Sequence, residues 1–132
     1  MEIKLLIDQA IEARKQAYTP YSNFQVGAAV LTKNSHIFLG CNIENASYGL
    51  TNCAERTAIF KAISEGEKDI EAIVIVGDTD GPISPCGACR QVMAEFCDEN
   101  TKVILTNLKG DVVETSIKQL LPGFFSSKDL AK

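Results

Sequence analysis

Three cysteines and one glutamate are grouped in a way that suits metal chemistry. Cys53 and Glu55 lie two residues apart, and further along the chain Cys86 and Cys89 form a Cys-x-x-Cys pair. Thiols at this spacing lie one helical turn apart on one face, so the pair can hold one tetrahedral ion. Structural zinc sites use four protein ligands, whereas catalytic sites keep three and leave the fourth position to water. The three grouped thiols therefore indicate a catalytic zinc site.

Glu55 is predicted to work as an acid and base beside the metal. Helical side chains two residues apart do not face each other, so Glu55 should not share the face of Cys53 as a further ligand. Three thiolates give a zinc site a net negative charge, and a hydrogen bond from Arg56 to a ligand sulfur would withdraw some of it. Arg90 could assist. The alternative for Arg56 is a solvent-facing helix residue.

The composition describes one globular domain over residues 1–132, with 45% apolar and 23% charged residues. The formal net charge is −4 without a cluster of Lys or Arg, which argues against a nucleic-acid polymer as partner. No apolar run approaches the ~20 residues of a membrane span, and the start lacks a secretory signal. The odd count of five cysteines suits a reducing compartment. We therefore expect no membrane partner and a cytoplasmic location.

Hydrophobic periodicity predicts an α/β chain of order αββαβαββα. Asn52 is the expected N-cap of the second helix, and Ser84 and Pro85 are the expected N-cap and first residue of the third. This order predicts a three-layer αβα fold with a mixed five-stranded sheet, whose strand ends carry both cysteine-bearing helices. The expected elements are a helix over 3–17, strands over 24–32 and 37–41, a helix over 53–65, a strand over 70–77, a helix over 86–97, strands over 102–107 and 112–115, and a helix over 117–121.

The order of the chemical residues resembles a known enzyme family. Cys53-Ala54-Glu55 followed by Pro85-Cys86-x-x-Cys89 is similar to the H-x-E and P-C-x-x-C signature of zinc-dependent nucleoside and nucleobase deaminases. A cysteine in place of the histidine is the pattern of the small cytidine deaminases. The resemblance covers essentially the whole chain, because further landmarks lie at residues 18–29, 40–46 and 120–123.

This resemblance implies hydrolytic deamination of cytidine and 2′-deoxycytidine, with release of ammonia, by a homotetramer of pyrimidine salvage. Zinc would lower the pKa of a bound water to roughly 7. Glu55 would take the proton of that water and deliver it to the ring and to the leaving amine. The implied substrate contacts are Phe24 at the base, Asn42 and Glu44 at the ribose, Ala54 and Tyr48, and Phe125 from another subunit.

Spacing gives independent support for the ribose contacts and for an interface. Asn42 and Glu44 point the same way in an extended chain, which suits a pair of sugar hydroxyls, although a solvated strand end is the alternative. Phe124 and Phe125 are adjacent, and adjacent exposed aromatics normally mark an interface. Phe124 departs from the family, in which this position is usually small. For Phe24 and Phe125 the alternative is a place in the core.

Three other functions remain open. Cys86 and Cys89 imitate a dithiol redox motif, which would leave Cys53 and Glu55 unexplained. A structural zinc module would need Cys41 as its fourth ligand. Within the same superfamily the competitor is a deaminase for a cytosine-containing antibiotic of the blasticidin S type.

The remaining cysteines and the single histidine have no predicted chemistry. Cys97 lies about 16 Å along its helix from Cys86 and cannot share the ion. Cys41 is expected to be a small buried hydrophobe. His36 falls in a hairpin turn and is expected to be solvated.

Overall fold

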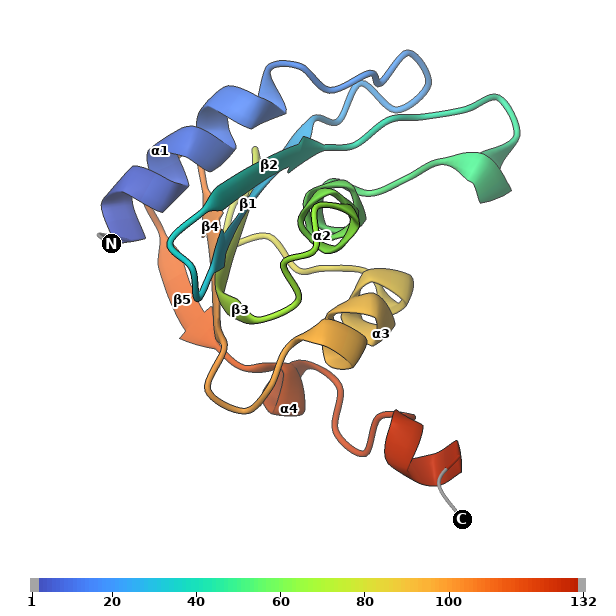
Figure 1. Ribbon diagram of the computed structural model, residues 1–132. Helices are drawn as coiled ribbons and strands as arrows, with labels where there is room; N and C mark the ends of the chain where they lie inside the picture. The colour runs from blue at the N-terminus through green and yellow to red at the C-terminus, as the bar shows by residue number, and fades with distance from the viewer. Residues whose placement is uncertain (1–2, 131–132) are drawn as a thin grey trace.

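A mixed five-stranded sheet forms the centre of the protein, and helices cover both of its faces (Figure 1). The structure is a computed structural model that describes residues 3–130. The strand order is β2-β1-β3-β4-β5, in which β3 and β4 run parallel and the other neighbours antiparallel. The strands are β1 (Val26–Thr32), β2 (Ile37–Cys41), β3 (Ile70–Gly77), β4 (Lys102–Asn107) and β5 (Val112–Thr115). The predicted αβα architecture is confirmed.

Four helices and two short 3-10 turns complete the described chain. Helix α1 lies against one face of the sheet, and α2 and α3 lie against the other (Figure 1). The 3-10 turns have no counterpart in the sequence prediction. The bounds are α1 (Ile3–Arg14), η1 (Tyr48–Leu50), α2 (Ala54–Ser64), α3 (Gly87–Phe96), α4 (Ile117–Leu120) and η2 (Ser127–Leu130).

Strand β3 explains why the sheet buries both faces. Val74 and Val76 pack in the core under α1, whereas Ile73 and Ile75 pack in the core shared by α2, α3 and α4. Successive side chains of a strand point to opposite faces, so a strand covered on both sides reads as a continuous apolar run. This run made β3 predictable with its observed bounds.

Helix α2 is held directly against β2 because the strand carries a glycine at the crossing. A Cβ atom on Gly40 would lie 2.5 Å from the carbonyl oxygen of Ala54 and 2.5 Å from the backbone nitrogen of Ala58. Real side chains do not approach backbone atoms so closely, so any larger residue would push the helix away. Gly40 therefore fixes the place of the first turn of α2.

Cys53 is the N-cap of α2, so the prediction of Asn52 at that position is wrong. The side-chain amide of Asn52 donates instead to the hydroxyl of Thr57, at 2.9 Å. Because this amide binds a side chain further along the helix, the cap position passes to the next residue.

Cys86 is likewise the N-cap of α3, so the predicted cap at Ser84 and first helical residue at Pro85 are wrong. The hydroxyl of Ser84 accepts a hydrogen bond from Arg90, at 2.6 Å. Helix α2 thus begins one residue later than predicted, and α3 begins at Gly87, two residues after the predicted Pro85, each with a cysteine at the cap.

The remaining differences concern element ends. Helix α1 ends at Arg14 rather than at residue 17, and β1 begins at Val26 rather than at Phe24. Phe24 stays outside the strand because its backbone N–H donates to the hydroxyl of Ser22, at 3.0 Å. Helices α2, α3 and α4 each end one residue earlier than predicted, at Ser64, Phe96 and Leu120. Within residues 3–130 no helix has the length and apolar character that crossing a bilayer requires.

Candidate metal centre and active site

The three predicted ligand thiols come together at one point. The sulfur atoms of Cys53, Cys86 and Cys89 all lie within 4.8 Å of one another. Cys86 Sγ is 3.8 Å from Cys53 Sγ and 3.3 Å from Cys89 Sγ. Sulfur ligands bound tetrahedrally to zinc at about 2.3 Å lie roughly 3.8 Å apart. The type, number and spacing of these donors therefore fit a zinc ion with one coordination position left for a non-protein ligand.

Two helix starts bring the thiols to this point. Cys53 and Cys86 occupy the N-caps of α2 and α3, and Cys89 lies in the first turn of α3. Unpaired backbone N–H groups give a helix N-terminus a positive potential, which favours thiolates over thiols. The two helices therefore supply favourable electrostatics as well as position.

Protons are unevenly shared among the thiols. The pKa of the Cys53 thiol is lowered, mainly by a hydrogen bond with Cys89 and further by one from Arg56. Burial acts in the opposite direction but does not offset these bonds. The hydrogen bond with Cys53, followed by burial, raises the pKa of Cys89. Without metal, Cys53 is therefore the thiolate of the pair, and Cys89 keeps its proton until a cation replaces it.

Cys41 and Cys97 lie outside this group. Among residues 3–130, the cluster with metal-binding spacing contains Cys53, Cys86 and Cys89. Cys97 is buried, and burial raises its pKa to about 12. Cys41 is half-buried rather than fully buried, and burial raises its pKa as well. The closed structural zinc site with Cys41 as fourth ligand thus lacks support in the geometry.

Glu55 is buried beside the thiols, with 4% of its surface exposed. Burial raises its pKa, and the charge of Cys53 adds to the effect. A carboxyl group in such a place exchanges a proton nearer neutral pH than an exposed glutamate does. The environment of Glu55 therefore suits proton transfer.

Arg56 contacts the metal-binding cluster and does not face solvent as the alternative supposed. Its Nη2 atom donates to Cys53 Sγ at 3.4 Å and to the carbonyl oxygen of Thr51 at 3.5 Å. The hydrogen bond with Cys53 raises the pKa of Arg56. Its Nε atom is buried without a hydrogen-bond partner among the described residues.

Arg90 has a different set of partners. Its guanidinium group donates to the carbonyl oxygens of Pro85 at 2.8 Å and Leu120 at 2.5 Å, and to the Ser84 hydroxyl at 2.6 Å. These bonds join the residues before Cys86 to the end of α4. They hold the Arg90 guanidinium group away from the thiols. No contact therefore supports the prediction that Arg90 helps Arg56 to withdraw charge from the thiolates.

A pocket of about 370 Å³ is lined by residues of η1 and of the loops before β1 and after β2, and Arg56 links one lining residue, Thr51, to Cys53. Its lining includes two of the predicted substrate contacts, Glu44 and Tyr48. Tyr48 is 79% exposed and makes an edge contact with Tyr21, with ring centroids 6.5 Å apart. The full lining is Tyr21, Ser22, Glu44, Tyr48 and Thr51. Tyr21 and Ser22 belong to the 18–29 landmark, which was the sequence signal for them, whereas Thr51 had none.

Glu44 holds one wall of this pocket in place. Its carboxylate accepts hydrogen bonds from the backbone N–H groups of Tyr21 at 3.0 Å and Ser22 at 3.1 Å, and from the Ser22 hydroxyl. The bond from the Ser22 hydroxyl is the main cause that lowers the pKa of Glu44. Sequence reasoning gave Glu44 a place in the site but missed that it organises the loop.

Asn42 does the same for the other end of that loop. Its amide nitrogen donates to the carbonyl oxygen of Phe24 at 2.8 Å, and its amide oxygen accepts from the backbone N–H of Val26 at 2.9 Å. The Asn42 side chain thereby hydrogen-bonds the backbone as a neighbouring strand would, at the point where β1 begins. Phe24 is held at the end of β3, where a Cβ atom on Gly77 would lie 3.3 Å from its ring.

The other predicted contacts lie apart from the pocket lining. Ala54 is fully buried in the core under α2. Phe125 is 59% exposed, and its carbonyl oxygen accepts from the Gln91 amide at 2.8 Å. Phe124 is half-buried against the same core as Ala54, so the expectation of two adjacent exposed aromatics is wrong. Backbone that turns at Gly123, with φ of 65°, directs one ring inward and leaves the other outside.

His36 is exposed at the β1–β2 turn, as expected, but it is not unpaired. Its Nδ1 atom contacts the carboxylate of Glu67, which also accepts from the hydroxyl of Thr32 at 2.6 Å. The Thr32 bond is the main cause that lowers the pKa of Glu67. This cluster ties the hairpin turn to the loop before β3.

The fold and the cluster together define a mononuclear zinc protein with three thiol ligands and an open position. Residues 1–105 match the model of the cytidine and deoxycytidylate deaminase zinc-binding region. The chain is 60% identical to a cytidine deaminase of Halalkalibacterium halodurans over 130 residues, which is 98% of each chain. It therefore belongs to the cytidine and deoxycytidylate deaminase family.

Solved structures and a functional competitor place the chain within that family. The crystal structure of cytidine deaminase from Burkholderia pseudomallei superposes with a TM-score of 0.92 at 55% identity, covering 95% of this chain and 100% of that one. A blasticidin-S deaminase of Bacillus cereus is 34% identical over 125 residues, which is 89% of this chain and 87% of the relative. The similarity is thus greater to the nucleoside deaminases than to the antibiotic deaminase.

We expect the substitution Glu55→Gln to stabilise the metal-free fold at neutral pH. Burial raises the folded-state pKa of Glu55 above its ordinary value of 4.5. Below the pKa of the unfolded chain, Glu55 is protonated in both states, so burying it carries no cost of charge and its contribution to stability is complete. That contribution is lost as the pH rises through the folded pKa, whereas glutamine loses nothing. Denaturant unfolding of both proteins with a chelator, between about pH 4 and about pH 8, should show a gap that grows with pH in favour of the glutamine variant. A gap independent of pH would show that burial leaves the ionisation of Glu55 unchanged.

Proposed function

We propose that the protein catalyses the hydrolytic deamination of cytidine and 2′-deoxycytidine to uridine and 2′-deoxyuridine, with release of ammonia. The observation that carries this proposal is the three-thiol cluster with buried Glu55 beside it. The donor set leaves one position for water, and Glu55 is a proton carrier in a place that shields it from bulk solvent. Family membership supplies the substrate class.

In this mechanism the protein groups hold the metal and move the protons. Zinc held by the three thiols would lower the pKa of a water to roughly 7, which would supply a nucleophile at neutral pH. Glu55 accepts one proton of the attacking water and delivers it to N3 of the cytosine ring, while the water oxygen forms a bond to C4. Glu55 then passes the second proton, from the new C4 hydroxyl, to the amine, so that the carbonyl at C4 forms, the C4–N bond breaks and ammonia leaves as a neutral molecule. Burial helps Glu55 in both roles because it brings the pKa toward neutrality.

Arg56 adjusts the electrostatics of the centre. Three thiolates and a divalent cation sum to a charge of −1, which makes the metal a weaker acid than a site with fewer thiolates. The Arg56 guanidinium donates to Cys53 Sγ at 3.4 Å and withdraws charge from that ligand. We assign it the function of keeping the bound water acidic.

The pocket beside the thiols is the proposed ribose site. A carboxylate offers about four acceptor positions, and Glu44 uses three of them on the Tyr21–Ser22 loop, which leaves one for a sugar hydroxyl. The Asn42 amide nitrogen carries two N–H groups and uses one on Phe24, so the other can donate to the sugar. Phe24 provides an aromatic face for the base, and Tyr48 lines the exposed side of the pocket.

The competing functions have less support. A dithiol redox protein would have no use for the Cys53 thiol, the buried Glu55 and the Arg56 contact that surround Cys86 and Cys89. An antibiotic deaminase of the blasticidin S type shares the metal centre and remains the second candidate. All five cysteines are free in the structure, which suits the reducing cytoplasm and a function in pyrimidine salvage.

A homotetramer with shared sites is the proposed assembly. Cys86 and the next two residues, Gly87 and Ala88, are exposed, so the metal centre lies open on this side of one chain, although Cys89 is buried. Phe125 projects from a tail that Gln91 of α3 holds in place. An exposed aromatic ring on an anchored backbone is suited to covering the open site of a neighbouring subunit.

The central test is an assay of purified protein with cytidine, in which the absorbance band of cytosine should fall and zinc should be present in about equimolar amount. Glu55→Gln should keep zinc and fold but lose turnover by about 10²- to 10⁴-fold, because the amide can neither accept nor deliver the proton. Blasticidin S is the comparison substrate. Turnover of blasticidin S alone would favour the second candidate, and near-wild-type turnover by Glu55→Gln would remove Glu55 from the mechanism.

The substitution Arg56→Ala should change the pH dependence of activity rather than the affinity for cytidine. Without the guanidinium the sulfur ligands donate more charge, the bound water becomes less acidic, and the acidic limb of the kcat profile should move to higher pH. Arg56→Lys keeps the positive charge and should lie between the two. A profile that stays in place while only KM rises would assign Arg56 to substrate binding instead.

The shared-site proposal is tested by mixing two defective chains. Glu55→Gln has no proton carrier but donates an intact Phe125, whereas Phe125→Ala keeps Glu55 but donates no ring, and loss of that stacking should cost about 1–3 kcal/mol. Refolding the two together should create some sites with both groups intact. Activity of the mixture should then exceed the average of the separate preparations.

The control for this experiment is mass spectrometry of the mixed assembly, which shows whether chains have exchanged. Activity at or below the average, in a preparation that contains mixed oligomers, would mean that Phe125 acts within its own chain.

A further inference from the structure

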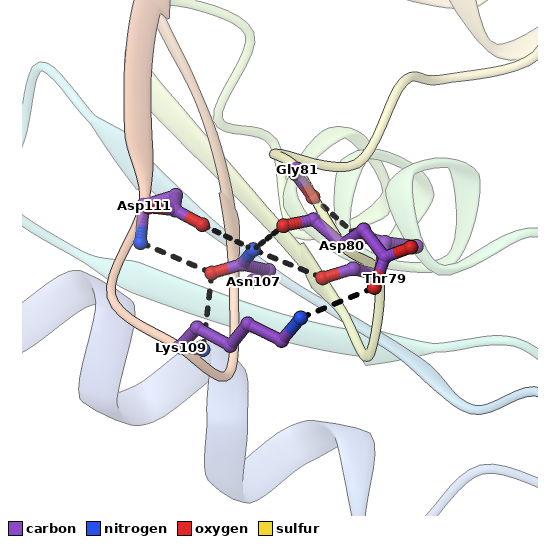
Figure 2. A network of polar contacts seen from close by, with 6 residues as sticks. All are labelled: Thr79, Asp80, Gly81, Asn107, Lys109 and Asp111. Atoms are coloured by element: carbon purple, nitrogen blue, oxygen red, sulfur yellow. Dashed lines mark hydrogen bonds and ion pairs between the residues drawn. The ribbon is translucent and has the colours of Figure 1, made fainter.

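The loop between β3 and α3 connects the centre of the sheet to the metal cluster, because it ends at Cys86. Residues 78–86 lie outside regular structure, so neither a ladder nor a helix determines their path. The position of Cys86 therefore depends on side-chain anchors along this loop. Figure 2 shows such an anchor at the beginning of the loop, centred on Asn107 of β4.

The Asn107 amide group binds the β3–α3 loop at two backbone carbonyl oxygens. Its Nδ2 atom lies 2.9 Å from the carbonyl oxygen of Thr79 and 3.1 Å from that of Asp80. The same nitrogen lies 2.9 Å from a carboxylate oxygen of Asp111. With 1% of its surface exposed, Asn107 makes these contacts where water cannot replace them (Figure 2).

The orientation of the Asn107 amide is itself fixed. Its oxygen accepts from the backbone N–H groups of Lys109 and Asp111, each at 3.0 Å. These bonds close the turn between β4 and β5 around the side chain. The donors of Asn107 therefore point at the loop in one direction only, whereas the exposed Lys109–Asp80 ion pair nearby can add little.

A second attachment follows further along the loop. The backbone N–H of Ile83 donates to the carbonyl oxygen of Thr106, the residue before Asn107, at 3.2 Å. Ile83 is buried over Gly77, where a Cβ atom would lie 2.6 Å from Ile83 Cδ1 and 3.3 Å from the ring of Phe24. The loop thus reaches the end of β3 at which the proposed base-contacting ring also packs.

Little chain separates these anchors from the metal ligand. Two residues lie between Ile83 and Cys86, and each spans at most about 3.5 Å, so the segment cannot absorb a large shift of the loop. Arg90 holds the same residues from the side of α3, through Ser84 and Pro85. A displacement at Asn107 must therefore reach Cys86 or strain the bonds of Arg90.

We propose that Asn107 is a positioning residue, which sets the place of Cys86 in the metal cluster and of Ile83, which packs at Gly77 as Phe24 does. The effect on the metal needs only the cluster itself, and the effect on the base rests on the proposed function. Asn107 does not touch the thiols. It acts through the backbone of the loop, from the strand end that lies opposite Gly77 in the β3–β4 register.

Asn107→Ala is compared with Thr101→Ala, a matched control at the other end of the same two strands. Thr101 is 2% exposed, and its hydroxyl donates to the carbonyl oxygen of Ile70 at 2.9 Å, so its loss also removes a buried hydrogen bond. Three quantities are measured for each variant. They are the visible absorption spectrum of the Co²⁺-substituted protein, the rate of zinc transfer to a coloured chelator, and KM and kcat for cytidine.

We expect Asn107→Ala to alter the cobalt spectrum and to speed zinc transfer by about 10- to 100-fold, the usual effect of losing a group that orients a metal ligand. KM for cytidine should rise by a larger factor than kcat falls, since a shift of Ile83 changes the surroundings of Gly77, where Phe24 packs. Thr101→Ala should lower the unfolding midpoint and leave the spectrum and the transfer rate at wild-type values.

Asp111→Ala keeps the test decisive if Asn107→Ala does not fold. It removes one partner of the Asn107 amide and should shift the spectrum and the transfer rate in the same direction by a smaller factor. Wild-type spectra and transfer rates in every folded variant would overturn the proposal, as would equal changes in Thr101→Ala. Altered metal readouts in a protein whose wild type does not act on cytidine would support the positioning function and reject the proposed reaction.

Discussion

The requirement that three sulfur atoms lie within 4.8 Å of one another constrains the rest of the structure. The thiols come from two helices separated by a strand, so both helices must begin at the same edge of the sheet. Strands β2 and β3 provide that edge, because both run antiparallel to β1 and the loops leading to α2 and α3 therefore leave them on the same side. Gly40 allows α2 to lie directly against β2, which brings Cys53 to the first turn of α3. The sheet thus aligns the N-termini of α2 and α3.

Charge imposes the second requirement. Three thiolates would repel one another and would be stable only beside positive groups, which here are the two helix N-termini, Arg56 and the zinc ion that the thiols would hold. The buried carboxyl of Glu55 adds a further negative group when ionised, which is one reason that its pKa is raised. The concentration of negative groups makes the centre unfavourable to assemble. The same negative charge raises the pKa of Glu55, which allows it to hold and release a proton.

The sequence predicted those features that depend on local pattern. The apolar run of β3, the hairpin of β1 and β2 and the grouping of the three thiols follow from periodicity and spacing. Features that depend on distant partners escaped prediction. Asn52 lost its cap position to Cys53 because its amide binds Thr57, and Phe124 turned into the core because the backbone bends at Gly123. The function of Asn107 could not be predicted either, since its partners Thr79 and Asp80 meet it only in the folded sheet.

The openness of the site is the remaining physical problem, and it bears on assembly. Electrostatic catalysis is strongest where water is excluded, because a low dielectric strengthens every charge interaction in the site. In one chain, Cys86 is exposed and Tyr48 is 79% exposed, so water reaches the centre from that side. The loops held by Glu44 and Asn42 close only the opposite wall. A single chain therefore positions the reacting groups without isolating them, and a neighbouring subunit that brings an aromatic ring such as Phe125 would supply the missing wall.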